Sequence, residues 1–214
     1  MRIVVFGARG KLGRLVVDEA LDRGHEVTAV ERDPAPFAAD RPGMTVVPGD
    51  VTDPDAVARA AAGHDAAVST IGPRVGTDGS YLADVARSLL AGIASAGVPR
   101  LLVVGGAGSL RVAGGGRLVD TPDFHPEWKP AALAHAAALE VYRAAGPEVD
   151  WVYFSPAAVF DAEGERTDRY RLGGDDLLTD ASGASHLSYA DGAAAVLAEL
   201  ENPRHHRERF TAAD

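Results

Sequence analysis

Short apolar runs alternate with longer amphipathic stretches along most of the chain. The apolar runs predict strands at residues 2–6, 26–31, 44–48, 66–70, 101–104 and 149–155. The stretches between them carry apolar residues at helical spacing, most clearly at 80–96 and 130–145, and glycines follow where these helices should stop. Because strands alternate with helices at short spacing, we expect a Rossmann-type α/β fold, a doubly wound parallel sheet with helices on both faces.

The regular alternation stops after residue 155. Segment 157–187 mixes glycine, aspartate and short apolar pieces, and it predicts two short strands. Ser188 and Asp191 predict a capping box for a last helix that ends near residue 200, and residues 209–212 predict an edge strand. A short helical turn is also expected at Asp33-Pro34, since proline favours the first helical position. We expect one domain, residues 1–214, with 157–187 as a small excursion on the substrate side.

Two connections are unusually long, residues 105–129 and residues 157–187. Both follow the carboxyl ends of predicted strands, which is the edge where open parallel sheets bind ligands. The glycines of the first connection, Gly105 and Gly106 among them, suggest mobility near a ligand. We therefore expect the two segments to cover a substrate site together.

Composition narrows the classes of function. A net charge of -10 argues against a nucleic-acid surface, and the absence of cysteine excludes disulfides and thiolate chemistry. The histidines and carboxylates show no metal-ligand spacing, and no apolar run reaches the roughly 20 residues that cross a bilayer. Met1 leads directly into the first predicted strand, so we expect a cytoplasmic protein. The sequence is rich in arginine and alanine and has only two lysines, which is typical of GC-rich bacterial genomes.

The first predicted strand runs straight into a turn with the glycine spacing GxxGxxG. Gly7 allows a tight turn, Gly10 lets the backbone approach a pyrophosphate, and Gly13 lets the following helix pack on the strand. The phosphates then meet the free N–H groups at the helix N-terminus. A purely structural turn is the alternative, but the position between a strand and a helix favours a dinucleotide site.

Several further segments carry a family resemblance. They are "ERDP" at 31–34, "GDVTDP" at 49–54, "VSTIGP" at 68–73, "RLLVVGGAGSL" at 100–110, "YFSPAAVF" at 153–160 and "HLSYADGAAAVLAEL" at 186–200. Together with the glycine turn, they resemble the atypical short-chain dehydrogenase/reductase (SDR) proteins. The chain is most similar to the NAD(P)H-binding group that includes NADH-flavin reductases and flavin/biliverdin reductase B, related to NmrA-like proteins.

The resemblance implies a set of cofactor contacts. It places the phosphates at Gly7, Arg9, Gly10, Lys11, Leu12 and Gly13, the adenine side at Arg32, Asp50 and Val51, the middle of the cofactor at Thr70, Ile71 and Gly72, and the nicotinamide end at Ser155, Pro156 and Ala157. Glu31, Gly105 and Gly106 are further candidates to bind the cofactor. For Asp50 a helix cap is the alternative, and for Ser155-Pro156 a plain strand terminator.

The choice between NADP and NAD rests on opposing charges. Glu31 ends the second predicted strand, where an acidic side chain usually binds the ribose hydroxyls of NAD. Arg32 follows it and Arg9 lies in the glycine turn, so both are candidates to pair with the 2′-phosphate of NADP. We expect NADP, with NAD as the possible second cofactor. The alternative is a surface ion pair between Glu31 and Arg32, with which the protein would not distinguish NADP from NAD.

The sequence departs from the larger family at the chemistry. No tyrosine has a lysine four residues later, so the usual proton-donating couple is missing. The resemblance aligns a site histidine with His135, and Ser109 is the hydroxyl nearest the family's serine position; a solvent-facing helix histidine and a structural loop serine are the alternatives. We expect a reductase that transfers hydride to a flavin, a quinone or another planar small molecule, as a monomer or homodimer. A non-catalytic NAD(P)-binding sensor of the NmrA-like type and a secondary-metabolism reductase or epimerase remain open.

Overall fold

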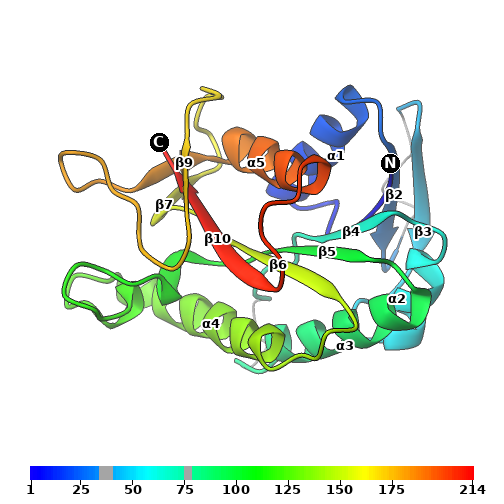
Figure 1. Ribbon diagram of the computed structural model, residues 1–214, viewed down its shortest axis with the longest axis horizontal. Coiled ribbons are helices and arrows are strands. Elements are labelled where there is room, and N and C mark those ends of the chain that lie inside the picture. The colour runs from blue at the N-terminus through cyan, green and yellow to red at the C-terminus, as the bar shows by residue number, and fades with distance from the viewer. Residues whose placement is uncertain (34–40, 75–78) are drawn as a thin grey trace.

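The computed structural model describes residues 1–33, 41–74 and 79–214. Its centre is an eight-stranded sheet of order β3-β2-β1-β4-β5-β6-β10-β8 (Figure 1). The strands are β1 (Arg2–Phe6), β2 (Glu26–Glu31), β3 (Met44–Pro48), β4 (Ala66–Ser69), β5 (Arg100–Val104), β6 (Asp150–Ser155), β8 (Arg171–Gly173) and β10 (Glu208–Ala213). All pairings are parallel except that of β10 with β8. The expected Rossmann-type fold is confirmed.

Helices cover both faces of this sheet. Helices α1 (Lys11–Asp22) and α5 (Tyr189–Glu201) lie on one face, and α2 (Pro54–Ala61), α3 (Tyr81–Ala96) and α4 (Lys129–Arg143) lie on the other (Figure 1). Alternate residues of β1 belong to two separate hydrophobic cores: Ile3 and Val5 pack toward α1 and α5, while Val4 and Phe6 pack toward α3. The four residues of β1 that follow exposed Arg2 are each buried on one face or the other, which explains their continuous apolar run.

Local sequence signals start and stop these helices. Asp53 accepts the Asp55 N–H (3.0 Å) at the start of α2, and Gly97 takes a left-handed conformation (φ 67°) at the end of α3. Ser188 accepts the Asp191 N–H (3.0 Å), so the predicted capping box of α5 is confirmed. Observed and expected boundaries differ by only one or two residues, within the usual uncertainty of helix and strand ends. The turn expected at Asp33-Pro34 falls on residues 34–40, outside the described part of the chain.

The C-terminal part differs from expectation. The prediction of an edge strand at 209–212 is wrong, because β10 lies between β6 and β8 and the short β8 forms the edge. The 157–187 segment holds β7 (Val159–Asp161), β8 and the start of β9 (His186–Ser188), and β7 pairs with β9 in a small second sheet. The strands of this segment have only three residues each and are surrounded by turns. Their sequence therefore has too little periodicity to predict which strand forms the edge of the sheet.

The 105–129 connection is structured by three short 3₁₀ helices, η1 (Ala107–Ser109), η2 (Leu118–Asp120) and η3 (Pro126–Trp128). A Cβ at Gly105 would lie 2.0 Å from the Tyr153 ring, and one at Gly108 would lie 2.6 Å from the Ala132 Cβ. Close packing therefore explains these glycines, whereas the sequence suggested mobility. The connection is also tied to the 157–187 segment, since the Arg111 N–H donates to the Asp175 carbonyl oxygen (2.9 Å).

A buried carboxylate anchors the 157–187 segment to α5. Asp191 accepts hydrogen bonds from the Thr167 N–H, the Asp168 N–H and the Ser188 hydroxyl at 2.8–3.1 Å. Burial alone raises the pKa of Asp191, but these hydrogen bonds outweigh burial and lower it below its usual value. The buried Asp191 carboxylate thus holds the 157–187 segment on α5 at Thr167 and Asp168.

Within the described residues, no helix is both long and apolar enough to cross a membrane. Nor do histidine and carboxylate side chains gather there into a group suited to hold a metal ion.

Candidate cofactor-binding site

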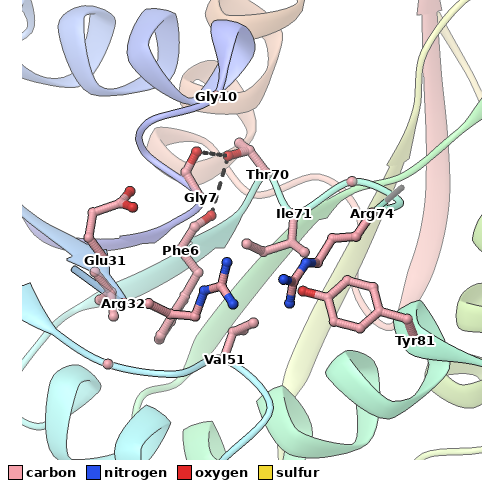
Figure 2. A pocket seen from close by; sticks show the side chains of 13 residues that line it. Phe6, Gly7, Gly10, Glu31, Arg32, Val51, Thr70, Ile71, Arg74 and Tyr81 are labelled. Atoms are coloured by element: carbon pink, nitrogen blue, oxygen red, sulfur yellow. Dashed lines mark hydrogen bonds between the residues drawn. The ribbon is translucent and has the colours of Figure 1, made fainter. Parts of the chain in front are cut away.

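The glycine turn is built as its spacing predicts. Gly7 has φ 89°, which favours glycine, and its carbonyl oxygen accepts the Gly10 N–H (3.0 Å). A Cβ at Gly13 would lie 2.1 Å from that same carbonyl oxygen, so only glycine lets α1 pack this closely on the turn. The Thr70 hydroxyl donates toward the Gly7 (3.1 Å) and Phe6 (3.3 Å) carbonyl oxygens (Figure 2). The end of β4 therefore holds the turn in place.

A cavity of about 270 Å³ opens beside this turn, at the carboxyl ends of β1, β2 and β4. It brings together many of the residues predicted to bind the cofactor. Those that line it are Gly7, Gly10, Glu31, Arg32, Val51, Thr70, Ile71 and Gly72. The turn, an apolar wall and charged groups thus surround one space, as an adenosine phosphate requires.

The charged groups of this cavity are segregated. The Glu31 carboxylate accepts the Arg9 N–H (3.0 Å) and points toward the glycine turn. The guanidinium groups of Arg32 and Arg74 approach the same space from two different segments, and Arg74 lies 5.5 Å from the centre of the Tyr81 ring (Figure 2). Glu31 therefore turns to the glycine backbone and away from Arg32, in contrast to the ion pair considered from the sequence.

Asp50 is not among the residues that line the cavity, although Gly49 and Val51 on either side of it are. Its Oδ1 accepts the Thr52 N–H (2.9 Å) and the Thr52 hydroxyl (2.8 Å), and these hydrogen bonds lower the pKa of Asp50, with further help from Arg32 and Arg74. The cap of α2 is Asp53, so the helix-cap alternative for Asp50 is wrong. Its expected contact with adenine stays a prediction.

Other residues expected to touch the phosphates do not line the cavity. These are Arg9, Lys11, Leu12 and Gly13. Gly13 acts through packing, and the Lys11 ammonium forms an exposed ion pair with Glu163 of the 157–187 segment (2.8 Å). Their contacts with a cofactor stay predictions.

Ile71 lines this cavity and also a second space, a narrow slit of about 10 Å³. His135 and Tyr153 line this slit, and the Tyr153 hydroxyl donates to the His135 carbonyl oxygen (2.9 Å). Burial lowers the pKa of His135 to about 4, and its ring makes no hydrogen bond with the described residues. A Cβ at Gly106 would lie 3.1 Å from this ring, so Gly106 packs against His135. The lowered pKa favours the neutral form of His135 near neutral pH.

The two catalytic candidates lie in different places. The Ser109 hydroxyl accepts a hydrogen bond from Arg209 (2.9 Å) and lines a separate cavity of about 500 Å³ on the outer side of α4. The Arg209 side chain is buried, and it also donates to Asp175. The contact between Arg209 and Ser109 could not be predicted, because β10 was expected at the edge of the sheet.

The residues expected around the nicotinamide are packed into the protein. Ser155, Pro156 and Ala157 are buried, and the Ser155 hydroxyl lacks a hydrogen-bond partner among the described residues. The Gly105 N–H donates to the Phe154 carbonyl oxygen (2.8 Å), which fixes the end of β5 beside the end of β6. An orphaned buried hydroxyl at a strand end is consistent with a polar ligand group nearby.

Arg74 and Tyr81 are among the cavity residues that sequence reasoning missed. Both follow the carboxyl end of β4, one just after "TIGP" and the other at the start of α3. The rule that ligands bind beyond the carboxyl ends of strands could have found them.

The residues present fit a nicotinamide dinucleotide. An added Cβ at Gly72 would meet no atom within 4 Å, and one at Gly10 would lie 3.4 Å from the Gly7 carbonyl oxygen, so both glycines face space that a ligand can occupy. The α1 N-terminus supplies N–H groups for a pyrophosphate, and Arg32 and Arg74 supply positive charge beside it.

Comparison with known proteins agrees with this geometry. The family model described as NAD(P)H-binding matches residues 7–203. YwnB of Bacillus subtilis (strain 168) is 39% identical over 213 residues, which cover 99% of this chain and 97% of YwnB. A crystal structure from Bacteroides thetaiotaomicron, provisionally named an epimerase, superposes with a TM-score of 0.90 at 41% identity and covers 99% of this chain and 96% of its own.

A second crystal structure, from Streptococcus pneumoniae TIGR4, is provisionally named an NADH-flavin reductase. It superposes with a TM-score of 0.89 at 34% identity, over 100% of this chain and 99% of its own. Both the family model and these relatives extend over nearly the whole molecule. The chain belongs to the NAD(P)H-binding family of the atypical SDR type.

Proposed function

We propose that this protein is an NAD(P)H-dependent reductase that transfers hydride to a flavin, a quinone or a similar conjugated acceptor. Family membership supports a nicotinamide cofactor and a small-molecule substrate. The identity of the acceptor is our inference from the chemistry of the nicotinamide end.

The observation that carries the proposal is the neutral, unpartnered His135 in the slit beside Tyr153. Burial raises the pKa of Tyr153 well above its usual value, so neither side chain readily changes its protonation state near neutral pH. An alcohol–ketone reaction needs a group that gives or takes the carbonyl proton, and this site offers a poor one. A conjugated acceptor has no such need, because it delocalises the electron pair it receives.

The bound nicotinamide supplies the hydride, and with it both electrons. A quinone that accepts this hydride takes its second hydrogen as a proton from water, which gives the hydroquinone and NAD(P)⁺. The protein holds the cofactor at the glycine turn and the arginines. His135 and Tyr153 would line one side of the space next to the reacting ring.

We further propose NADP as the preferred cofactor. Arg32 and Arg74 approach one space in the cavity, and the Glu31 carboxylate faces the glycine turn instead. Two guanidinium groups suit the 2′-phosphate of NADP, and charge-assisted contacts are the stronger kind. Arg74 takes the role that the sequence analysis gave to Arg9.

The test is turnover of NADPH and NADH with FMN, FAD and small quinones in the absence of metal, followed by the loss of reduced-nicotinamide absorbance. His135→Ala should lower the rate by less than the roughly 10²–10⁴-fold expected for a lost general acid. A loss within that range would show that His135 moves a proton and would contradict the proposed chemistry.

A non-catalytic NAD(P)-binding sensor is the second candidate. The slit next to His135 measures only about 10 Å³, which leaves little room for a substrate unless a side chain moves. Tight cofactor binding without turnover across the acceptor panel would favour this candidate. The third candidate, a secondary-metabolism reductase or epimerase, predicts activity confined to bulky substrates.

The cellular setting is also a proposal. We place the protein in the cytoplasm as a monomer or homodimer. Cell fractionation tests the location, and light scattering after size-exclusion chromatography tests the oligomeric state.

A further inference from the structure

We propose that Trp128, together with the ring of His125, is the surface on which the planar acceptor stacks. This inference rests on the proposed reductase function and names the residue that selects its substrate class. It is drawn from the exposure of Trp128, its position relative to His135, and its ring contact.

Trp128 is unusually exposed for a tryptophan. Its exposed fraction is 59%, the largest among the exposed large hydrophobic side chains of the described residues. The other tryptophan, Trp151, is 3% exposed and packs in the core against Tyr142. Burying a tryptophan is favourable, and this chain buries one and leaves the other in solvent.

The position of Trp128 places it at the ligand-binding edge of the sheet. Helix α4 connects the parallel strands β5 and β6, so its N-terminus lies at their carboxyl ends (Figure 1). Trp128 immediately precedes α4, and His135 lies seven residues later. Seven residues make nearly two full helical turns, so both side chains project from about the same face, roughly 10 Å apart along the axis.

That face is the one that meets the slit. His135 lines the slit with Ile71 and Tyr153, whereas Leu133 lies on another face of α4 and lines the cavity that contains Ser109. An acceptor ring that lies against the His135 end of this face therefore lies near Trp128 at its other end.

The surroundings of Trp128 favour an aromatic ligand. The rings of His125 and Trp128 lie 5.0 Å apart between centroids with a 32° tilt, and both residues are exposed. His125 thus supports one side of the indole and leaves indole surface open to solvent. Flat, conjugated molecules gain most from such a surface, because stacking depends on overlap between rings.

The experiment measures binding of FMN and menadione to the protein saturated with NADP⁺, a state in which no hydride is available. With FMN and menadione as probes, Trp128→Leu should raise Kd at least fivefold, and it should raise the KM for menadione with little change in kcat. Trp128→Phe should restore most of the affinity, since it keeps a stacking ring. Leu133→Ala, which changes an exposed apolar residue on another face of α4, should leave both constants unchanged.

Intrinsic fluorescence adds a direct reading. The chain has only two tryptophans, so FMN or menadione that stacks on Trp128 should quench the solvent-exposed emission and leave that of buried Trp151. Quenching without any turnover would support stacking and overturn the reductase. Unchanged Kd and KM in Trp128→Leu, with normal turnover, would overturn stacking and leave the reductase standing.

Discussion

The glycine turn allows binding and folding to be separated by substitution. Gly10 has φ -63°, which suits any L-residue, and a Cβ there would meet only the Gly7 carbonyl oxygen at 3.4 Å. Gly10→Val should therefore change stability by less than about 1 kcal/mol. The side chain would occupy the space through which a pyrophosphate approaches the α1 N–H groups. Each charge-assisted hydrogen bond is worth about 1.5–3 kcal/mol, so losing one raises Kd by about 10- to 150-fold.

Isothermal titration with NADPH, together with urea unfolding, measures both effects. Gly116→Val is the matched control, because a Cβ at Gly116 meets no atom within 4 Å and the residue lies outside the cavity. Gly13→Ala is the opposite case: its Cβ would lie 2.1 Å from the Gly7 carbonyl oxygen, so the fold itself should be destabilised. Unchanged NADPH affinity in a folded Gly10→Val protein would refute the assignment of this turn to the cofactor.

Three further predictions follow from charged groups. Glu31→Gln keeps an acceptor for the Arg9 N–H and should shift the preference toward NADPH over NADH by up to about fivefold. Arg74→Gln should weaken the binding of NADPH by about 10-fold or more and change the binding of NADH little. Equal losses of affinity for both cofactors would contradict the role of Arg74. His135 has a pKa of about 4 when folded and about 6.5 when unfolded, so the unfolded chain binds the proton first as the pH falls. About 3 kcal/mol of stability should therefore be lost between pH 6.5 and 4, and His135→Leu should flatten that part of the urea-unfolding profile; parallel profiles would contradict it. Asp191→Asn should lower the free energy of unfolding by about 2–4 kcal/mol, because it weakens the hydrogen bonds that hold the 157–187 segment on α5. The control Asp168→Asn, at an exposed side chain, should lower it by less than about 0.5 kcal/mol. Equal losses of stability would show that the Asp191 hydrogen bonds are unimportant.

The first two thirds of the fold could be predicted because short apolar strands alternate there regularly with amphipathic helices. Strands β1, β4 and β5 are short apolar runs, and glycines or capping residues mark the ends of most of the helices. The C-terminal part could not be predicted in the same way. The place of β10 between β6 and β8 depends on residue pairs separated by 56 positions with β6 and by 38 to 42 positions with β8. The strand β8 has only three residues, which is too few to signal this pairing in the sequence.

The adenosine side of the site was more predictable than the nicotinamide side. Glycine spacing constrains the backbone directly, so Gly7, Gly10 and Gly13 take the conformations and contacts that their positions imply. Side chains that act through tertiary contacts gave no such signal. Ser109 turns to Arg209, a residue 100 positions away, and His135 loses its charge because other segments bury it.

The most direct test of the reductase proposal is a single-turnover experiment. Protein loaded with NADPH is mixed rapidly with menadione in the absence of oxygen and metal, and the loss of reduced-nicotinamide absorbance is followed with ordinary NADPH and with NADPH deuterated at C4. We expect one hydroquinone formed per NADPH, a slower reaction with the deuterated cofactor, and little change of the rate in His135→Ala. Tight NADPH binding with no oxidation by menadione, FMN or FAD would contradict it.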